Sequence, residues 1–346
     1  MSRYLPWLFV VLLLSVPLWL TDFYFLHILI TTGIFIIAAM SLNLLLGYTG
    51  QLSLGHVAFF GIGAYTSALV SLGFEVQLFP GFTVGIAPKP VWFAMLCAVV
   101  IAGFTGFAIG KLAFRVRGAY FVIVSISFAE VVRLVAVNWV ELTQGPMALN
   151  NIPALTLGAG AFELSFLRKP AFFILVVVAG VVSFVLIARL VNSYAGRAMN
   201  ALRENESLAM SVGIDVTRYL VIATIVSAAI AGMAGALYTH YIRIVDPDIF
   251  LFIYTVTMVI MVITGGKGTL AGPIVGGIIF GFLPEFLRAW AIQPEVQWIV
   301  YGVLMVLVVY FLPKGIVPAI QHYIVNRKRP PDAETMTATP AEAPQK

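Results

Sequence analysis

The sequence is short of charged residues and has a single cysteine. Asp, Glu, Lys and Arg together make up 10% of its 346 residues, whereas roughly 25% is usual in soluble domains. A soluble globule of this size needs more polar residues to cover its surface, so a cytosolic enzyme is excluded. The lone cysteine, Cys97, can form no internal disulfide and offers no metal-ligating or redox pair. No cofactor and no bound metal are expected.

Long apolar runs take the place of the missing charge. Hydrophobic residues make up 61% of the chain, above the roughly 45–50% of average soluble domains, which indicates an integral membrane protein. A membrane-spanning helix needs about 20 mostly apolar residues. The sequence predicts ten such helices and therefore an all-α polytopic membrane protein. The predicted spans are 5–21, 25–46, 57–73, 91–114, 119–137, 170–190, 219–241, 251–264, 271–288 and 296–312.

The placement of positive charge predicts the orientation of these spans, because Lys and Arg favour cytoplasmic loops. With both termini cytoplasmic, 14 of the 20 Lys and Arg residues lie on the inner side. The six on the outer side are Lys89, Arg133, Arg168, Lys169, Arg243 and Arg288. We therefore predict a transmembrane domain over 1–318 and a cytoplasmic tail over 319–346, disordered towards its end. The net charge of +5 then marks inner loops and not a nucleic-acid surface.

One turn between predicted spans is devoid of charge. No Asp, Glu, Lys or Arg occurs from Phe23 to Phe74, so the turn at 47–56 has no ionised group to hold it in water. We predict a broken or re-entrant segment there, since lipid tolerates irregular backbone only where protein or a cavity surrounds it. An ordinary short loop with a small-residue packing face is the alternative. The neutral polar side chains that suit a translocation path are Gln51, Ser53 and His56.

A second polar stretch opens the long outer loop predicted over 138–169. Residues 142–147 read Leu-Thr-Gln-Gly-Pro-Met, and a loop of this kind suits contact with an external partner or gating. Thr143 and Gln144 are its candidate translocation-path residues. A plain connector between two spans is the alternative.

The segment 197–213 predicts a short helix on the inner side. A single helix from Arg197 to Val212 would be apolar on one side and charged on the other, and Gly213 is well placed to end it. The segment is too polar to span the membrane, so we interpret it as a helix displayed to a soluble partner. A surface helix lying at the lipid head groups is the alternative. Its candidate partner contacts are Arg203, Glu204, Asn205, Glu206 and Gly213.

A glycine-rich turn at 264–273 looks faintly like a phosphate loop but fails the pattern. A Walker A loop needs glycine five residues before its Gly-Lys pair and Ser or Thr directly after it. Those positions hold Met261 and Gly268. The chain is therefore expected to have no nucleotide site and no catalytic activity of its own. Two charges inside the fifth predicted span, Glu130 and Arg133, are three residues apart and are expected to pair.

Taken in order, these polar stretches resemble the sequence blocks of a known family. The run Gly47–Thr66 resembles the N-terminal signature of the LivM-type permeases, which are inner-membrane subunits of ABC importers for branched-chain amino acids. The likeness covers about residues 30–318. Further blocks that resemble the family in the same order are Leu142–Met147, Arg203–Glu206 with Gly213-Ile214, Gly265–Leu270 and Pro313–Gly315.

The resemblance implies a location and a set of partners. It implies a lipid bilayer, the bacterial inner membrane, a second permease subunit, two cytoplasmic ATPase subunits and a periplasmic substrate-binding protein. Segment 197–213 would then be the coupling helix that enters a groove on an ATPase. Gln144 and the stretch 148–150 depart from the family pattern, and importers of urea and short-chain amides use similar permeases, so the cargo stays open. A secondary transporter is a weaker alternative, because it would need intramembrane charges that the sequence hardly has.

Overall fold

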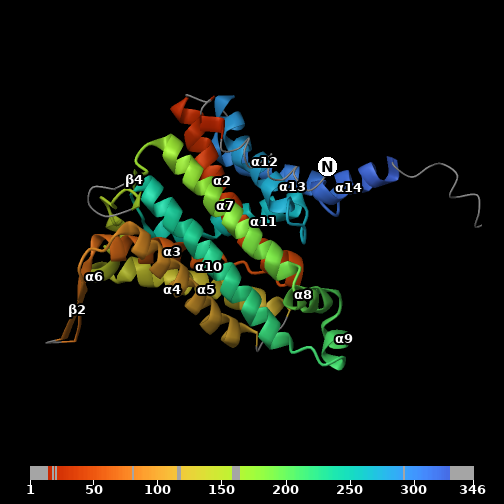
Figure 1. The fold of residues 1–346 in the computed structure, drawn as a ribbon, viewed down its shortest axis with the longest axis horizontal. Helices are drawn as coiled ribbons and strands as arrows, with labels where there is room; N and C mark the ends of the chain where they lie inside the picture. The colour runs from red at the N-terminus through yellow and green to blue at the C-terminus, as the bar shows by residue number, and fades with distance from the viewer. Residues whose placement is uncertain are drawn as a thin grey trace, which may run out of the picture.

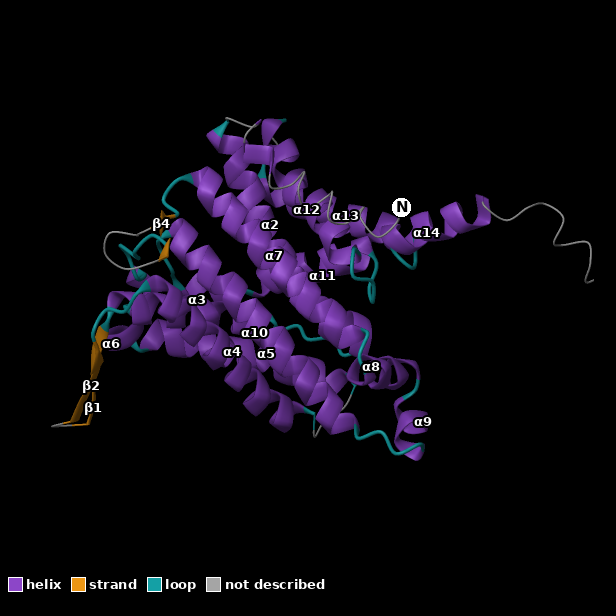
Figure 2. Ribbon diagram, in the orientation of Figure 1, coloured by secondary structure: helices purple, strands orange, loops and turns teal. Residues whose placement is uncertain are grey.

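The computed structural model describes residues 15–17, 19, 22–79, 82–114, 118–157, 164–290 and 293–327. Most of the first predicted span, 5–21, lies outside the described residues, and so does the predicted tail beyond Arg327. The described chain is mostly helical (Figures 1 and 2). Its longer helices are α2 (Phe23–Asn43), α3 (Val57–Leu72), α4 (Val91–Ala113), α5 (Ala119–Asn138), α7 (Lys169–Val191), α10 (Val216–Ile242), α11 (Phe252–Gly265), α12 (Gly272–Ala289), α13 (Pro294–Phe311) and α14 (Ile316–Arg327).

Shorter elements connect these helices. Two antiparallel hairpins, at 74–86 and 156–165, are small exceptions to the predicted all-α class. The shorter elements are η1 (Leu44–Thr49), β1 (Phe74–Phe79), β2 (Phe82–Ile86), α6 (Val140–Thr143), η2 (Gly145–Met147), β3 (Thr156–Leu157), β4 (Leu164–Ser165), α8 (Tyr194–Glu204), α9 (Glu206–Ser211) and η4 (Pro247–Phe250).

Nine of the longer helices coincide with the second to tenth predicted spans, in this order: α2, α3, α4, α5, α7, α10, α11, α12 and α13. Within the described residues, five helices are long and apolar enough to cross a membrane: α2 with its continuation to Thr49, α4, α5, α7 and α10. The chain is thus a multi-pass, predominantly helical membrane protein, and the number of ten crossings stays a prediction. The expected pair inside α5 is present, since Arg133 Nη2 lies 2.6 Å from Glu130 Oε1.

Helices α2 and α10 form the centre of the bundle. In the apolar stretch of each of these two helices, 72% of the residues are buried, against 33% in α4, 22% in α5 and 28% in α7. Helices α3 and α4 pack on α10, whereas α7, α11 and α12 pack on α2. Small residues allow the close approach: a Cβ atom at Gly63 of α3 would lie 2.2 Å from the Gly232 oxygen of α10. Helices α4, α5 and α7 therefore present apolar side chains outward.

Connections predicted to share one side of the membrane gather at one end of the bundle. Arg203 donates to the Gly47 oxygen, and Gly268 lies against both residues. At the opposite end, a bridge between Leu149 and Val245 joins two connections predicted to lie outside. Figure 1 shows the same separation, with α8 and α9 at one end and β1, β2 and α6 at the other. We call these the inner and outer ends, following the orientation predicted from charge.

The chain breaks between α2 and α3, as predicted. Helix α2 continues as the π-helix η1, Gly50 takes a positive φ of 76°, and an irregular stretch then leads into α3. Ser53 and His56 in this stretch are 3% and 0% exposed. The segment is therefore sunk into protein and is not a solvated loop. The π geometry was not predicted.

The prediction of one helix from Arg197 to Val212 is wrong. The structure has two helices, α8 and α9, separated by Asn205 with an extended backbone of φ −159° and ψ 108°. The Asn205 side-chain oxygen accepts from the Leu208 amide at 3.0 Å. Asn side chains cap helix starts in this way and thereby compete with helix continuation. The residue taken as one of the polar positions of a continuous helix is instead the N-cap of a second one.

Candidate coupling and translocation site

Asn43 ties the inner end of α2 to the turn between α11 and α12. Its amide nitrogen donates to the Thr269 oxygen at 2.9 Å, and its side-chain oxygen accepts from the Gly268 amide at 2.9 Å. Asn43 is 1% exposed. A buried amide with both ends bonded is satisfied and fixes the two segments in one register.

Arg203 joins a third segment to the same place. Its Nη1 donates to the Gly47 carbonyl oxygen at 2.9 Å, and its Nη2 lies 3.0 Å from Glu204 Oε1. Carbonyls at a helix end lack intrahelical partners and carry the negative end of the helix dipole. The Arg203 cation therefore caps the inner end of α2 and η1. Since Arg203 belongs to α8, this bond connects the predicted coupling segment directly to a central helix.

The closeness of this contact depends on glycine. A Cβ atom at Gly47 would lie 2.3 Å from the Gly268 nitrogen, and one at Gly268 would lie 2.6 Å from Arg203 Nη1. Any larger residue forces the segments apart. We call the five residues that meet here the inner junction; they are Asn43, Gly47, Arg203, Gly268 and Thr269.

Sequence reasoning found the pieces of the inner junction but not their meeting. The glycine-rich stretches at 47–56 and 264–273 were singled out separately, and Asn43 was missed. Arg203 was expected to face an ATPase, whereas the structure turns its guanidinium back towards Gly47. A polar residue at the last turn of an otherwise apolar helix was the available signal for Asn43.

Helix α9 displays an apolar surface at the inner end. Leu208 of α9 is 64% exposed and Val212, its C-cap, 71%, while Ala209 between them is buried against the bundle. The Glu204 side chain, at the end of α8, is 75% exposed. Gly213, with φ +87°, closes the helix: its amide bonds to Met210, and the Ile214 amide bonds to Ala209. This is the Schellman arrangement, which favours glycine, so the predicted cap is present.

His56 is part of a buried polar contact between central helices. Its Nε2 lies 2.8 Å from Ser41 Oγ, and that hydroxyl donates to the Ala38 oxygen at 2.6 Å. Because the hydroxyl proton is used on Ala38, His56 Nε2 is the donor to Ser41. Ser227 of α10 donates to the Ser41 carbonyl oxygen. His56 thus links the start of α3 to α2 and, through Ser41, to α10.

The space beside Ser53 is closed in this conformation. A cavity of about 10 Å³ is lined there by Ser53, Gly55, Ser125 and Thr224, among others. That is about the least volume that holds one water molecule. The Leu54 amide bonds to Ser125 Oγ at 3.1 Å, which fixes the irregular stretch against α5. Gln51, nearer the inner end, is half-exposed.

Thr143 and Gln144 do not share this site. Thr143 Oγ1 donates to the Ala136 oxygen at 2.6 Å and accepts from the Gly145 amide at 3.2 Å, so it braces its own turn. Gln144 is exposed, with a positive φ of 58°. Between Ser125 and the end of α5 lie about 20 Å of helix, at 1.5 Å per residue. The structure therefore separates the two predicted parts of the translocation path.

Comparison with known proteins adds the family. The family described as "Branched-chain amino acid transport system / permease component" matches residues 24–309. The high-affinity branched-chain amino acid transport system permease protein LivM of Salmonella typhimurium is 31% identical over 310 residues, covering 83% of this chain and 68% of that protein. LivH of Escherichia coli is 26% identical over 285 residues, covering 80% of this chain and 89% of that protein.

A more distant relative is similar over nearly its whole length. The probable branched-chain amino acid transport permease protein LivM of Methanocaldococcus jannaschii is 25% identical over 323 residues, which cover 84% of this chain and 92% of that protein. No solved structure gives a significant match. The resemblance to LivM-type permeases is confirmed. The chain is a multi-pass membrane protein that belongs to the family of permease components of branched-chain amino acid transport systems.

Proposed function

We propose that the chain is the permease subunit of an ATP-binding-cassette importer that carries branched-chain amino acids across the bacterial inner membrane. The family match supports the transport role and the cargo class. The energy comes from two separate cytoplasmic ATPase subunits, and a periplasmic binding protein delivers the cargo. The chain itself binds and hydrolyses no ATP.

The observation that carries this proposal is the bond between Arg203 and Gly47. Leu208 of α9 and its C-cap Val212 are exposed, and such apolar side chains suit a groove on a soluble partner. Helix α8, joined to α9 at Asn205, holds the inner end of α2 through Arg203. A displacement of α8 and α9 by an ATPase is thereby passed to a central helix. Glu204 and Glu206 set the docking register through charge pairs, and Gly213 lets the chain return to the bundle.

The translocation path is proposed to run beside the broken segment. Gln51, Ser53 and His56 form its inner part, closed in the present conformation by the packing around Ser53. Thr143 and Gln144 belong to its outer part, where they shape the surface that meets the binding protein. Opening requires the irregular stretch before α3 to separate from α5 near Ser125, which accepts a hydrogen bond from the Leu54 amide.

A second permease subunit is proposed to cover part of the exposed apolar surface. The chain is similar to both LivM and LivH proteins, and two related subunits suit a paired arrangement around one path. Only 22% of the residues in the apolar stretch of α5 are buried within this chain. That helix, which flanks Ser53, is the proposed contact with the second permease.

Reconstitution tests the proposal. The chain is purified with the subunits encoded beside its gene and placed in liposomes, and uptake of radiolabelled leucine is measured with and without ATP and binding protein. We expect ATP-dependent leucine uptake and leucine-stimulated ATPase activity. ATPase activity stimulated by urea or acetamide, and not by leucine, would instead identify the cargo as urea or short-chain amides. Uptake driven by an ion gradient without ATP would refute the importer assignment.

A further inference from the structure

A cavity at the outer end of the bundle is not used by the proposed transport function. It measures about 270 Å³ and opens between the first turns of α2 and α7 and the last turn of α10. We call it the outer pocket. Its volume is far larger than the closed space beside Ser53.

Two cationic side chains line the outer pocket. Lys169 Nζ donates to the Phe23 oxygen at 3.0 Å, and Arg243 Nε donates to the Ile152 oxygen at 2.9 Å. Neutral carbonyls thus anchor both groups, and neither has a salt-bridge partner among the described residues. An ammonium has three donors and a guanidinium five, so each keeps donors to offer a ligand. Both belong to the minority of cations predicted on the outer side, where positive charge is usually scarce.

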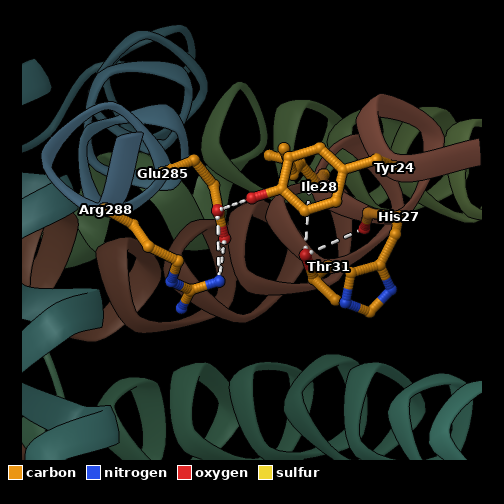
Figure 3. A network of polar contacts seen from close by, with 6 residues as sticks. All are labelled: Tyr24, His27, Ile28, Thr31, Glu285 and Arg288. Atoms are coloured by element: carbon orange, nitrogen blue, oxygen red, sulfur yellow. Dashed lines mark hydrogen bonds and ion pairs between the residues drawn. The ribbon is translucent and has the colours of Figure 1, made fainter. Parts of the chain in front are cut away.

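No carboxylate lines the outer pocket among the described residues. Glu285, at the same end of the bundle, is engaged elsewhere: Arg288 Nη1 lies 3.1 Å from it, and the Tyr24 hydroxyl donates to it. Figure 3 shows this chain of contacts directed to Tyr24, apart from the His27 ring that lines the pocket. The charge on the residues that line the pocket is therefore positive.

The rest of the pocket is apolar or aromatic. The buried Phe172 ring packs on Tyr241 with centroids 5.0 Å apart, and the Tyr241 hydroxyl is 2.7 Å from His27 Nδ1. Leu167 and Ile242 on the lining are 65% and 36% exposed. A ligand that fits must combine an anion with an apolar chain. An amino acid fits poorly, because its ammonium group would find no carboxylate.

We propose that the outer pocket binds an anionic head group, a phosphate or a carboxylate, that carries an apolar chain. Lys169 and Arg243 hold the anion through charge-assisted hydrogen bonds, and the apolar chain leaves over Leu167 and Ile242. Two sources supply this chemistry: an anionic lipid of the outer leaflet, or a small soluble carboxylic acid. The inference does not depend on the proposed cargo or on ATPase coupling.

Native mass spectrometry of the full chain tests the lipid source. The protein is placed in nanodiscs of phosphatidylcholine with added phosphatidylglycerol, and the lipids that remain bound on release are identified. Saturation-transfer NMR with 4-methylpentanoate, in nanodiscs of phosphatidylcholine alone, tests the soluble source. The test variant is Lys169→Gln with Arg243→Gln. The matched control is Arg168→Gln, which removes an adjacent positive charge that does not line the pocket.

We expect the wild type and Arg168→Gln to retain phosphatidylglycerol over phosphatidylcholine, or to bind 4-methylpentanoate. The double variant should bind at least about ten-fold more weakly, since it loses two charge-assisted contacts. Leu167→Glu changes an exposed position that has no structural bonds among those described, and it should weaken binding in the same way. This variant therefore tests the proposal even if the double variant misfolds. The arm that shows this dependence identifies the source. Equal binding by all four proteins, or no binding in either arm, would overturn the proposal.

Discussion

Arg203 and Gly47 lie 156 residues apart in the sequence, and the Arg203 guanidinium donates to the Gly47 carbonyl oxygen at 2.9 Å. The bond runs from α8, one of the short inner helices, to η1 at the inner end of α2, one of the two central helices. It also stands next to Gly268, so three connections meet at one cation. Arg203 is thus a positioning residue. Its loss should leave the ATPase subunits able to dock, while their movement no longer reaches α2.

We expect Arg203→Ala to uncouple the importer. The ATPase subunits should still bind α9 and hydrolyse ATP, whereas leucine uptake should fall at least about ten-fold, because hydrogen bonds to charged groups contribute about 1.5–3 kcal/mol. Uptake and ATP hydrolysis are measured in the same proteoliposomes. Arg218→Ala, at an exposed inner arginine, is the control and should leave the ratio of uptake to hydrolysis unchanged. Parallel loss of both activities in Arg203→Ala would instead make Arg203 a docking residue.

The contact between Gly47 and Gly268 should not tolerate a methyl group. In Gly47→Ala the new Cβ would lie 2.1 Å from Asn43 Oδ1 and 2.3 Å from the Gly268 nitrogen, and overpacking of this kind costs about 1–3 kcal/mol. Gly302→Ala is the matched control, since nothing lies within 4 Å of its added Cβ. Thermal unfolding in detergent should show a lower midpoint for Gly47→Ala only. Identical midpoints would mean that the inner junction is looser than described.

Cysteines on the exposed surface of α9 should cross-link to the ATPase subunit. In a Cys97→Ser background we expect Leu208→Cys and Val212→Cys to form cross-links with cysteines in the ATPase groove, because both side chains point away from the bundle. Leu112→Cys, exposed at the inner end of α4, should not. Non-reducing gels of membranes give the answer. Cross-linking only through the turn at 264–270 would transfer the docking role to that turn.

His56 and Ser41 should behave as one unit in stability measurements. Truncating one partner leaves the other buried without its bond, which costs about 1–3 kcal/mol, so His56→Ala and Ser41→Ala should each lower the unfolding midpoint. The double variant should lose less than the sum of the two, as interacting pairs do. Additive losses would show that the 2.8 Å contact between Nε2 and Oγ contributes no coupling.

The same residues show how far sequence reasoning reaches. Apolar runs located nine helices, because a span of fixed length needs a continuous apolar stretch. The absence of charge between Phe23 and Phe74 located the break at Gly50. The division at Asn205 escaped prediction, since an Asn side chain either tolerates a helix or caps the next one according to its surroundings. The inner junction escaped it too, because no local pattern pairs Asn43 with a turn 225 residues away.

The π-helical geometry of η1 gives this region a second available register. Helical residues advance by about 1.5 Å and rotate by about 100° each, and a π turn holds a wider ring than an α turn. Conversion of Leu44–Thr49 to α geometry would therefore shift the following residues by one step along the axis. A rotation of that size would carry the Gly47 oxygen out of reach of Arg203. The π winding of these six residues and the bond from the Arg203 guanidinium are therefore expected to be kept or lost together.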